Sequence, residues 1–302
     1  MAAPSAWSVP QLTYGITPPK VSMAEPRRRS VAAAQSERIR SLPVDALVVY
    51  DLQDESSRTD VERPFPFMRA IDPLDYALDY LEVPQPKVVY RSVSGHDAAS
   101  LGAWLERLRS AGGATVLVGA PSRSQSVSLR LSDAYAVHEA RSPDLPLGGV
   151  LIAERHAARG NEDQRCLRKV ERGCSFFISQ AVYSVIASKN LLSDLVYRCQ
   201  DEGREVPPIL LTLTPCGSKK TLDFLAWLGV EVPRWLQNEL AHAKDILSTS
   251  IETSVAAFEE LHDFAAQKGI RLGCNVESVS IRRAEIDASV ELVERVAKIL
   301  GR

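Results

Sequence analysis

The sequence has no apolar run near the roughly 20 residues that a helix needs to cross a bilayer. Its first residues also lack the charged-then-apolar pattern of a signal peptide. Its charge is balanced, because 36 Lys and Arg residues face 38 Asp and Glu residues, and the net charge is -2. This balance gives no electrostatic attraction to nucleic acid or to an anionic membrane. We therefore expect a cytoplasmic protein with small-molecule partners, with homo-oligomerisation left open.

Cysteine is scarce, and several well-known motifs are missing. The five cysteines lie far apart, without the paired spacing of zinc sites or disulfide frameworks: Cys166, Cys174, Cys199, Cys216 and Cys274. The glycine-rich Rossmann fingerprint, the Walker loop, His-Glu-x-x-His and Gly-x-Ser-x-Gly do not occur. These absences disfavour a metal site, a Rossmann dehydrogenase, an NTPase and an α/β-hydrolase.

Short β-branched apolar runs alternate with longer amphipathic segments along the chain, which is the pattern of repeated β-α units. Eight runs predict strands, at Leu12–Ile16, Ala46–Tyr50, Lys87–Arg91, Ala114–Val118, Gly149–Ala153, Phe176–Gln180, Ile209–Leu213 and Arg271–Val276. Eight such units in 302 residues predict one α/β domain, a (β/α)8 TIM barrel over residues 11–302. Residues 1–10 are expected to be disordered.

Helices are expected between and after these strands, at Ser30–Ser41, Pro73–Leu81, Asp97–Ala111, Gln164–Arg172, Ser184–Glu202, Lys219–Leu228, Ala243–Lys268 and Arg283–Leu300. The segment Ser56–Asp72 interrupts the repeat and is rich in charge, proline and phenylalanine. Long insertions of this kind often cover active sites. We expect this segment to form a lid over the barrel mouth.

The most informative segment spans residues 147–183, where polar groups stand close to the ends of two predicted strands. These groups are Glu154-Arg155-His156, Arg168-Lys169 and Ser179-Gln180. Enzymes with a (β/α)8 barrel place their chemistry at the carboxyl ends of the strands. The segment therefore predicts part of a functional site.

In order and spacing, these groups resemble the methylenetetrahydrofolate reductases, which carry Glu-x-His, Arg-Lys and Thr-Gln in the same region. Further matches are Pro18-Pro19, Arg58-Thr59, Pro233-Arg234-Trp235 and Arg283-Ala284-Glu285. The resemblance covers nearly the whole chain. It implies a (β/α)8 barrel that reduces 5,10-methylenetetrahydrofolate to 5-methyltetrahydrofolate with NADH or NADPH.

The resemblance also implies roles for single residues. Gln180 is expected to bind the pterin, Tyr183 and Phe224 to stack on a ring, and Arg283 to receive the glutamate tail of folate. The nucleotide is expected to lie against four residues: Gly119, His156, Arg168 and Lys169. Each side chain also has a structural alternative, such as a core position for Tyr183 and Phe224 or a satisfied histidine for His156.

Two departures from the family pattern concern the chemistry itself. The family carries a glutamate on its first strand, within Phe-Glu-Phe-Phe-Pro-Pro, whereas residues 14–19 here read Tyr-Gly-Ile-Thr-Pro-Pro, so Gly15 replaces the acid. The family holds its flavin with Arg-Gly-Asp, whereas residues 118–120 read Val-Gly-Ala. The chain thus looks most like the flavin-free branch of the family. We expect no FAD and direct hydride transfer from the nicotinamide.

Opening the folate ring to an iminium ion needs a proton donor. Glu55, or its neighbour Asp54, is the candidate, because crowded carboxylates after the second strand can raise one another's pKa. A solvated acidic loop is the alternative. Two other functions stay open at this point: the same reaction with flavin held by altered contacts, and a folate-binding protein without catalysis.

Overall fold

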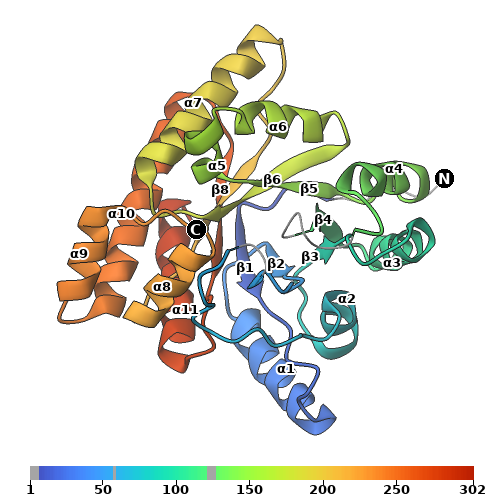
Figure 1. The fold of residues 1–302 in the computed structure, drawn as a ribbon, viewed down its shortest axis with the longest axis horizontal. Coiled ribbons are helices and arrows are strands. Elements are labelled where there is room, and N and C mark those ends of the chain that lie inside the picture. The colour runs from blue at the N-terminus through green and yellow to red at the C-terminus, as the bar shows by residue number, and fades with distance from the viewer. Residues whose placement is uncertain (1–6, 57–58, 121–126) are drawn as a thin grey trace.

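The structure of the protein is a computed structural model that describes residues 7–56, 59–120 and 127–302. Eight parallel strands form a closed barrel in sequence order, with helices packed around it (Figure 1). The strands are β1 (Leu12–Ile16), β2 (Ala46–Val49), β3 (Lys87–Ser92), β4 (Ala114–Val118), β5 (Leu147–Leu151), β6 (Cys174–Ala181), β7 (Ile209–Leu213) and β8 (Leu272–Glu277). The predicted (β/α)8 barrel is confirmed.

The helices fall close to the predicted positions, with three additions: α4, α5 and α9. They are α1 (Glu25–Arg40), α2 (Pro73–Asp75) continued by the π-helix η2 (Tyr76–Tyr80), α3 (Ala98–Ser110), α4 (Leu131–Arg141), α5 (Ala153–Arg159), α6 (Glu162–Val170), α7 (Val185–Asp201), α8 (Lys219–Trp227), α9 (Arg234–His242), α10 (Ile246–Gln267) and α11 (Arg283–Ile299). The additions are short helices of 7 to 11 residues, and each buries at most two apolar side chains, so their apolar signal in the sequence is small.

Strand β5 lies two residues earlier than its predicted bounds of Gly149–Ala153. Gly148 and Gly149 allow this, because a Cβ on either would stand 2.6 Å from the ring of a phenylalanine on β6, Phe176 or Phe177. The strand therefore ends at Leu151, and helix α5 begins at Ala153. The residues that sequence reasoning placed in a loop after this strand lie on a helix instead.

The inside of the barrel is apolar over most of its length. Side chains from alternate positions of the strands fill it, including Val48, Val88, Val116 and Phe176. Trp7 packs beneath them, with its ring centroid 6.3 Å from that of Phe176. Residues 7–10 belong to the described part of the chain, residues 1–6 lie outside it, and disorder of residues 1–10 stays a prediction.

A cavity of about 510 Å³ lies at the amino-terminal end of the barrel. Its wall is formed by residues 7–11 and by residues next to the starts of strands, such as Asp45 and Arg271. Functional groups of this fold gather at the opposite end, where the strands finish. We therefore follow the carboxyl ends of the strands. Among the described residues, no helix is long and apolar enough to cross a membrane.

Candidate functional site at the carboxyl end of the barrel

A carboxyl group stands inside the barrel mouth, on Glu277 at the last position of β8. Strand β8 pairs with β1, and the partner of Glu277 is Gly15. The Glu277 side chain is half-buried, and its carboxyl hydrogen-bonds with the phenol of Tyr50, which follows β2. Strands β8, β1 and β2 thus form one wall around this acid.

Asn275 organises the polar layer below the acid, two residues earlier on β8. Its Nδ2 donates to the hydroxyl oxygens of Tyr50 at 2.8 Å and Thr212 at 3.2 Å. Its Oδ1 accepts from Thr13 at 2.9 Å. Because the Tyr50 oxygen accepts from Asn275, the Tyr50 proton is available to Glu277. The network fixes the acid on a rigid part of the barrel.

Gly15 leaves the space that the acid and its partner use. A Cβ on Gly15 would lie 2.8 Å from Cε2 of Tyr50, 3.0 Å from Cβ of Glu277 and 3.3 Å from its Oε2. Any side chain on Gly15 would therefore have to displace the Tyr50 ring or the acid. The acid missing from the first strand has a counterpart on the neighbouring strand, at the same level of the barrel.

Burial raises the pKa of Glu277 to about 7, although hydrogen bonds from Tyr50 and Asn275 oppose the shift. The titratable groups facing it are the phenols of Tyr50 and Tyr90, whose rings lie 4.8 Å apart. Burial raises the pKa of both phenols as well, so they stay protonated at neutral pH. A carboxyl that titrates near neutrality can deliver a proton at physiological pH.

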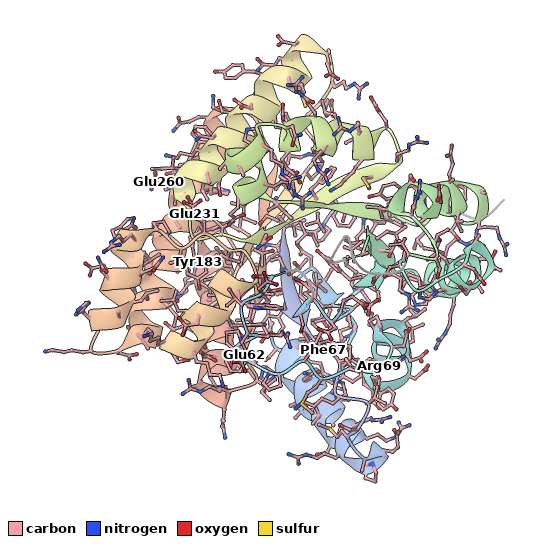
Figure 2. All side chains as sticks on the ribbon, viewed as in Figure 1. Glu62, Phe67, Arg69, Tyr183, Glu231 and Glu260 are labelled. Carbon is pink, nitrogen blue, oxygen red and sulfur yellow. The ribbon has the colours of Figure 1, made fainter. Side chains whose placement is uncertain are left out.

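Residues 59–72, which we call the strap, run across the mouth from the β2 side to α8 and back to α2. Glu62, Phe67 and Arg69, labelled in Figure 2, mark this course from the side of α8 toward α2. Trp227 at the end of α8 donates from Nε1 to the carbonyl of Val61 at 3.0 Å. The strap therefore lies along the side of the mouth formed by β8, β1 and β2, and its role as a lid stays a prediction.

The aromatic face of α8 holds the strap. Phe65 meets the ring of Phe224 edge-on at 5.2 Å, and the Lys220 ammonium lies 4.8 Å from the Phe65 ring. The Arg63 guanidinium lies 5.1 Å from the ring of Phe224 and 5.2 Å from that of Trp227. These contacts combine apolar burial with cation–π attraction.

The other end of the strap is held by strand β3 and by the loop after β1. Asp72 accepts a hydrogen bond from Arg91 of β3 at 2.6 Å. The backbone N–H of Val21 donates to Arg69 at 2.9 Å, and that of Ile71 donates to Pro19 at 3.0 Å. The Pro18-Pro19 motif thus lies where the strap meets the first strand's loop. Arg58 of the Arg58-Thr59 motif lies outside the described residues.

Gln180 and Glu154 are brought together, as their places at neighbouring strand ends predict. Both line a small cavity of about 10 Å³ between β5, β6 and α7. Gln180 donates from Nε2 to the carbonyl of Leu228 at 3.1 Å, and Glu154 accepts from the N–H of Glu231 at 3.2 Å. Burial raises the pKa of Glu154. A pterin contact of Gln180 stays a prediction.

The other predicted substrate residues have structural partners. Tyr183 is buried and donates to the carbonyl of Thr214 at 2.6 Å, which matches the core alternative. Phe224 is 7% exposed and lies under the strap, stacked on Trp227 at 5.9 Å. Arg283 has a side chain that is 94% exposed and is paired with Asp287. Their contacts with folate stay predictions.

In the Arg283-Ala284-Glu285 motif, Glu285 makes structural hydrogen bonds. Glu285 is buried and accepts from the N–H of Gly217 at 2.8 Å and from the hydroxyl of Thr221 at 2.7 Å. A Cβ on Gly217 would lie 2.6 Å from Cγ of Glu285. Glu285 therefore ties α11 to the start of α8.

The proposed acids after β2 differ from one another. Asp54 is exposed, and the N–H and hydroxyl of Ser56 donate to its carboxylate at 3.0 and 2.6 Å. These hydrogen bonds lower the pKa of Asp54, which is opposite to what a held proton requires. Glu55 is half-buried, and its role as a proton donor stays a prediction.

The four residues predicted to hold the nucleotide do not form one site. His156 is buried on α5, donates from Nε2 to Asp194 at 2.9 Å and accepts at Nδ1 from the N–H of Glu162. Lys169 points from α6 onto the sheet, where it donates to the carbonyl of Val150. These positions follow from the early end of β5, which moves His156 onto a helix. The satisfied structural histidine is the alternative that the geometry favours.

The remaining two nucleotide candidates also lie apart. Arg168 is exposed on α6, whereas Gly119 follows β4, and a Cβ added to it would lie 3.8 Å from Cβ of Leu131. Arg168 and Lys169 thus share a helix on the outside of the barrel, and Gly119 alone of the four stands at the mouth. Among the described residues, no group of His, Cys, Asp and Glu could hold a metal ion.

Sequence reasoning missed the acid that the structure places in the mouth. The signal that pointed to it was alternation on the last strand, because Asn275 and Glu277 are polar residues two apart, separated by Val276. Residues two apart on a strand share a face. Two polar groups on the inner face at a strand's carboxyl end indicate a site in this fold.

These features define the class of the protein as a (β/α)8 barrel with a strap along its mouth and an acid at the end of the last strand. An uncharacterized protein from Clostridium thermocellum that binds two copies of 5-methyl-5,6,7,8-tetrahydrofolic acid is 41% identical, with a TM-score of 0.83. The alignment covers 95% of this chain and 95% of that chain. The chain therefore belongs to the family of the Clostridium thermocellum protein.

More distant structures share the fold alone. The EDTA monooxygenase of Chelativorans sp. BNC1 is 12% identical, with a TM-score of 0.51, over 97% of this chain and 93% of that chain. Family profiles gave no match, and the curated proteins gave none either.

Proposed function

We propose that the protein binds a reduced folate in the carboxyl-end mouth of its barrel and reduces 5,10-methylenetetrahydrofolate to 5-methyltetrahydrofolate. The observation that carries the proposal is the relative from Clostridium thermocellum, which binds two copies of 5-methyltetrahydrofolic acid. That molecule is the product of the proposed reaction. At 41% identity over nearly the full length, a shared ligand class is the simplest expectation.

The proposed reaction needs a proton and a hydride. Protonation of the bridge nitrogen N10 lets its bond to the one-carbon unit break, which leaves a positively charged iminium at N5. A reduced nicotinamide nucleotide, NADH or NADPH, supplies the hydride that adds to the iminium carbon. The sum consumes one proton and one hydride and yields the methyl group. The barrel mouth supports the first requirement, because a half-buried acid stands there.

The proposal is for direct transfer, without FAD. Its support lies in the sequence, where Val118, Gly119 and Ala120 stand in place of the Arg-Gly-Asp that holds flavin in the reductases. The four residues expected to hold the nucleotide do not converge, so we assign it no set of contacts.

A folate-binding protein without catalysis is the second candidate, and Gly15 is the observation that favours it. A reductase needs an acid, and the first strand has none. The two candidates agree on folate binding and differ on turnover.

The test combines binding with turnover on the same preparation. Calorimetry should show saturable binding of 5-methyltetrahydrofolate, and nicotinamide oxidation, followed by absorbance, should occur only when 5,10-methylenetetrahydrofolate is added. Binding without oxidation would select the non-catalytic candidate. No binding of either folate would overturn the whole proposal. Product formed only after added FAD would select the flavin-dependent version.

A further inference from the structure

We propose that Glu277 is the catalytic acid of this protein, placed on the last strand at the position that faces Gly15. The inference rests on the proposed reductase function and names the group that opens the folate ring. It replaces the acidic loop after β2 as the source of the proton.

The first support is the place of the side chain. Glu277 and Gly15 are partners across β8 and β1, and Oε2 of Glu277 lies 3.3 Å from the point where a Cβ on Gly15 would stand. The carboxyl therefore occupies the space above the first strand, inside the mouth. A ligand seated on this end of the barrel meets the acid from above, because the apolar layer closes the barrel below it.

The second support is that the other acids near the mouth are engaged. Asp51 accepts from the N–H of Ser92 at 2.8 Å and lies near Arg91, whose guanidinium also pairs with Asp72. Glu285 is tied to the start of α8, and Asp54 is held as the anion by Ser56. Burial raises the pKa of Asp51 and of Glu154, which lies beside Gln180, and Glu55 is half-buried, so these three carboxyls are the remaining rivals.

The third support is the hydrogen-bonding network around the acid. Tyr50 accepts a hydrogen bond from Asn275 and therefore presents its own proton to Glu277. One carboxyl oxygen is then oriented by the phenol. The second oxygen can carry the proton toward a ligand. The neighbours of this network on β1 and β7 include Gly15 and Thr212, which are uncharged.

The step is a proton transfer with bond cleavage. The protonated carboxyl of Glu277 gives its proton to N10 of the bound folate as the bond between N10 and the one-carbon bridge breaks. The electron pair of that bond becomes the N–H bond, and the iminium forms at N5. Glu277 is left as the carboxylate and is reprotonated from solvent before the next turnover.

The test compares Glu277→Gln, Glu154→Gln and Glu205→Gln, the last at an exposed site remote from the mouth. We expect Glu277→Gln to lower kcat by about 100-fold or more, as loss of a catalytic acid does. It should still bind 5-methyltetrahydrofolate and keep the wild-type melting curve, and Glu205→Gln should match wild type. A loss in Glu154→Gln with an active Glu277→Gln would overturn the assignment.

The pH profile separates proton donation from a structural role. Because the protonated form is the active one, kcat/KM of the wild type should fall as pH rises through about 7. Tyr50→Phe removes a hydrogen bond that lowers the pKa of Glu277, so the falling limb should move to higher pH. An unmoved limb in Tyr50→Phe would contradict the proposal. A wild type that binds folate without turnover would overturn the reductase function and the assignment together, whereas an active wild type with a fully active Glu277→Gln would overturn the assignment alone.

Discussion

Gly15 and Glu277 are paired on adjacent strands. Because Gly15 has no side chain, the carboxyl of Glu277 can occupy the space beside it. The ring of Tyr50 fills the rest of the same space. This arrangement explains why a glycine stands at the end of a strand whose other described residues, such as Tyr14 and Ile16, are buried and bulky. Glycine inside a strand often marks the close approach of another group.

Gly15→Ala should destabilise the fold. Its Cβ would stand 2.8 Å from the Tyr50 ring and 3.0 Å from Cβ of Glu277, so the ring must shift. Overpacking of this kind costs about 1–3 kcal/mol of the free energy of unfolding. Thermal unfolding should show a lower Tm. Gly95→Ala is the matched control, because no described residue lies within 4 Å of an added Cβ there. Equal melting of the two variants would contradict the packing described for the mouth.

At the scale of elements, the strap joins parts of the chain that are far apart in sequence. It starts after β2, contacts α8 through Arg63 and Phe65, and ends at Asp72 before α2. Composition predicted a lid here. The aromatic face of α8 that receives it was not predicted, because Phe224 was assigned to the ligand.

Phe65→Ala should loosen the strap without unfolding the barrel. The change removes the edge contact with Phe224 and the cation–π contact with Lys220. Trypsin should then cleave within residues 59–72 several-fold faster, because locally open segments are cut first, while the Tm should stay near that of wild type. Met68→Ala is the control, at an exposed side chain of the same segment. Equal cleavage rates in both variants would show that the aromatic contacts do not hold the strap.

The bounds of some strands could be predicted from the sequence, whereas those of β5 could not. β1, β4 and β7 match their predicted bounds, since each is a run of apolar or β-branched residues. β5 does not, because its paired glycines carry no hydrophobic signal and the rings of β6 that cover them are remote in sequence. That shift of two residues moved His156 from the expected site onto a helix.

For the whole molecule, the closed barrel could be predicted from the count and order of strands, since eight β-α units in a chain of this length have few other solutions. The polar wall inside the mouth could not. It depends on the pairing of β8 with β1, which brings together residues more than 250 positions apart, as the hydrogen bond between Thr13 and Asn275 shows. The family resemblance predicts an acid on the first strand. In the closed barrel the acid at this position belongs to the last strand, β8, which pairs with β1.

The most direct measurement follows a deuterium label from the nicotinamide into the product. The protein as purified, with no flavin added or removed, should be given 5,10-methylenetetrahydrofolate and a nicotinamide nucleotide deuterated at the transferable C4 position, and the product analysed by mass. We predict 5-methyltetrahydrofolate with one deuterium in its methyl group and none lost to water. Label washed out into solvent would indicate a flavin relay, and absence of the methylated product would contradict the reductase account itself.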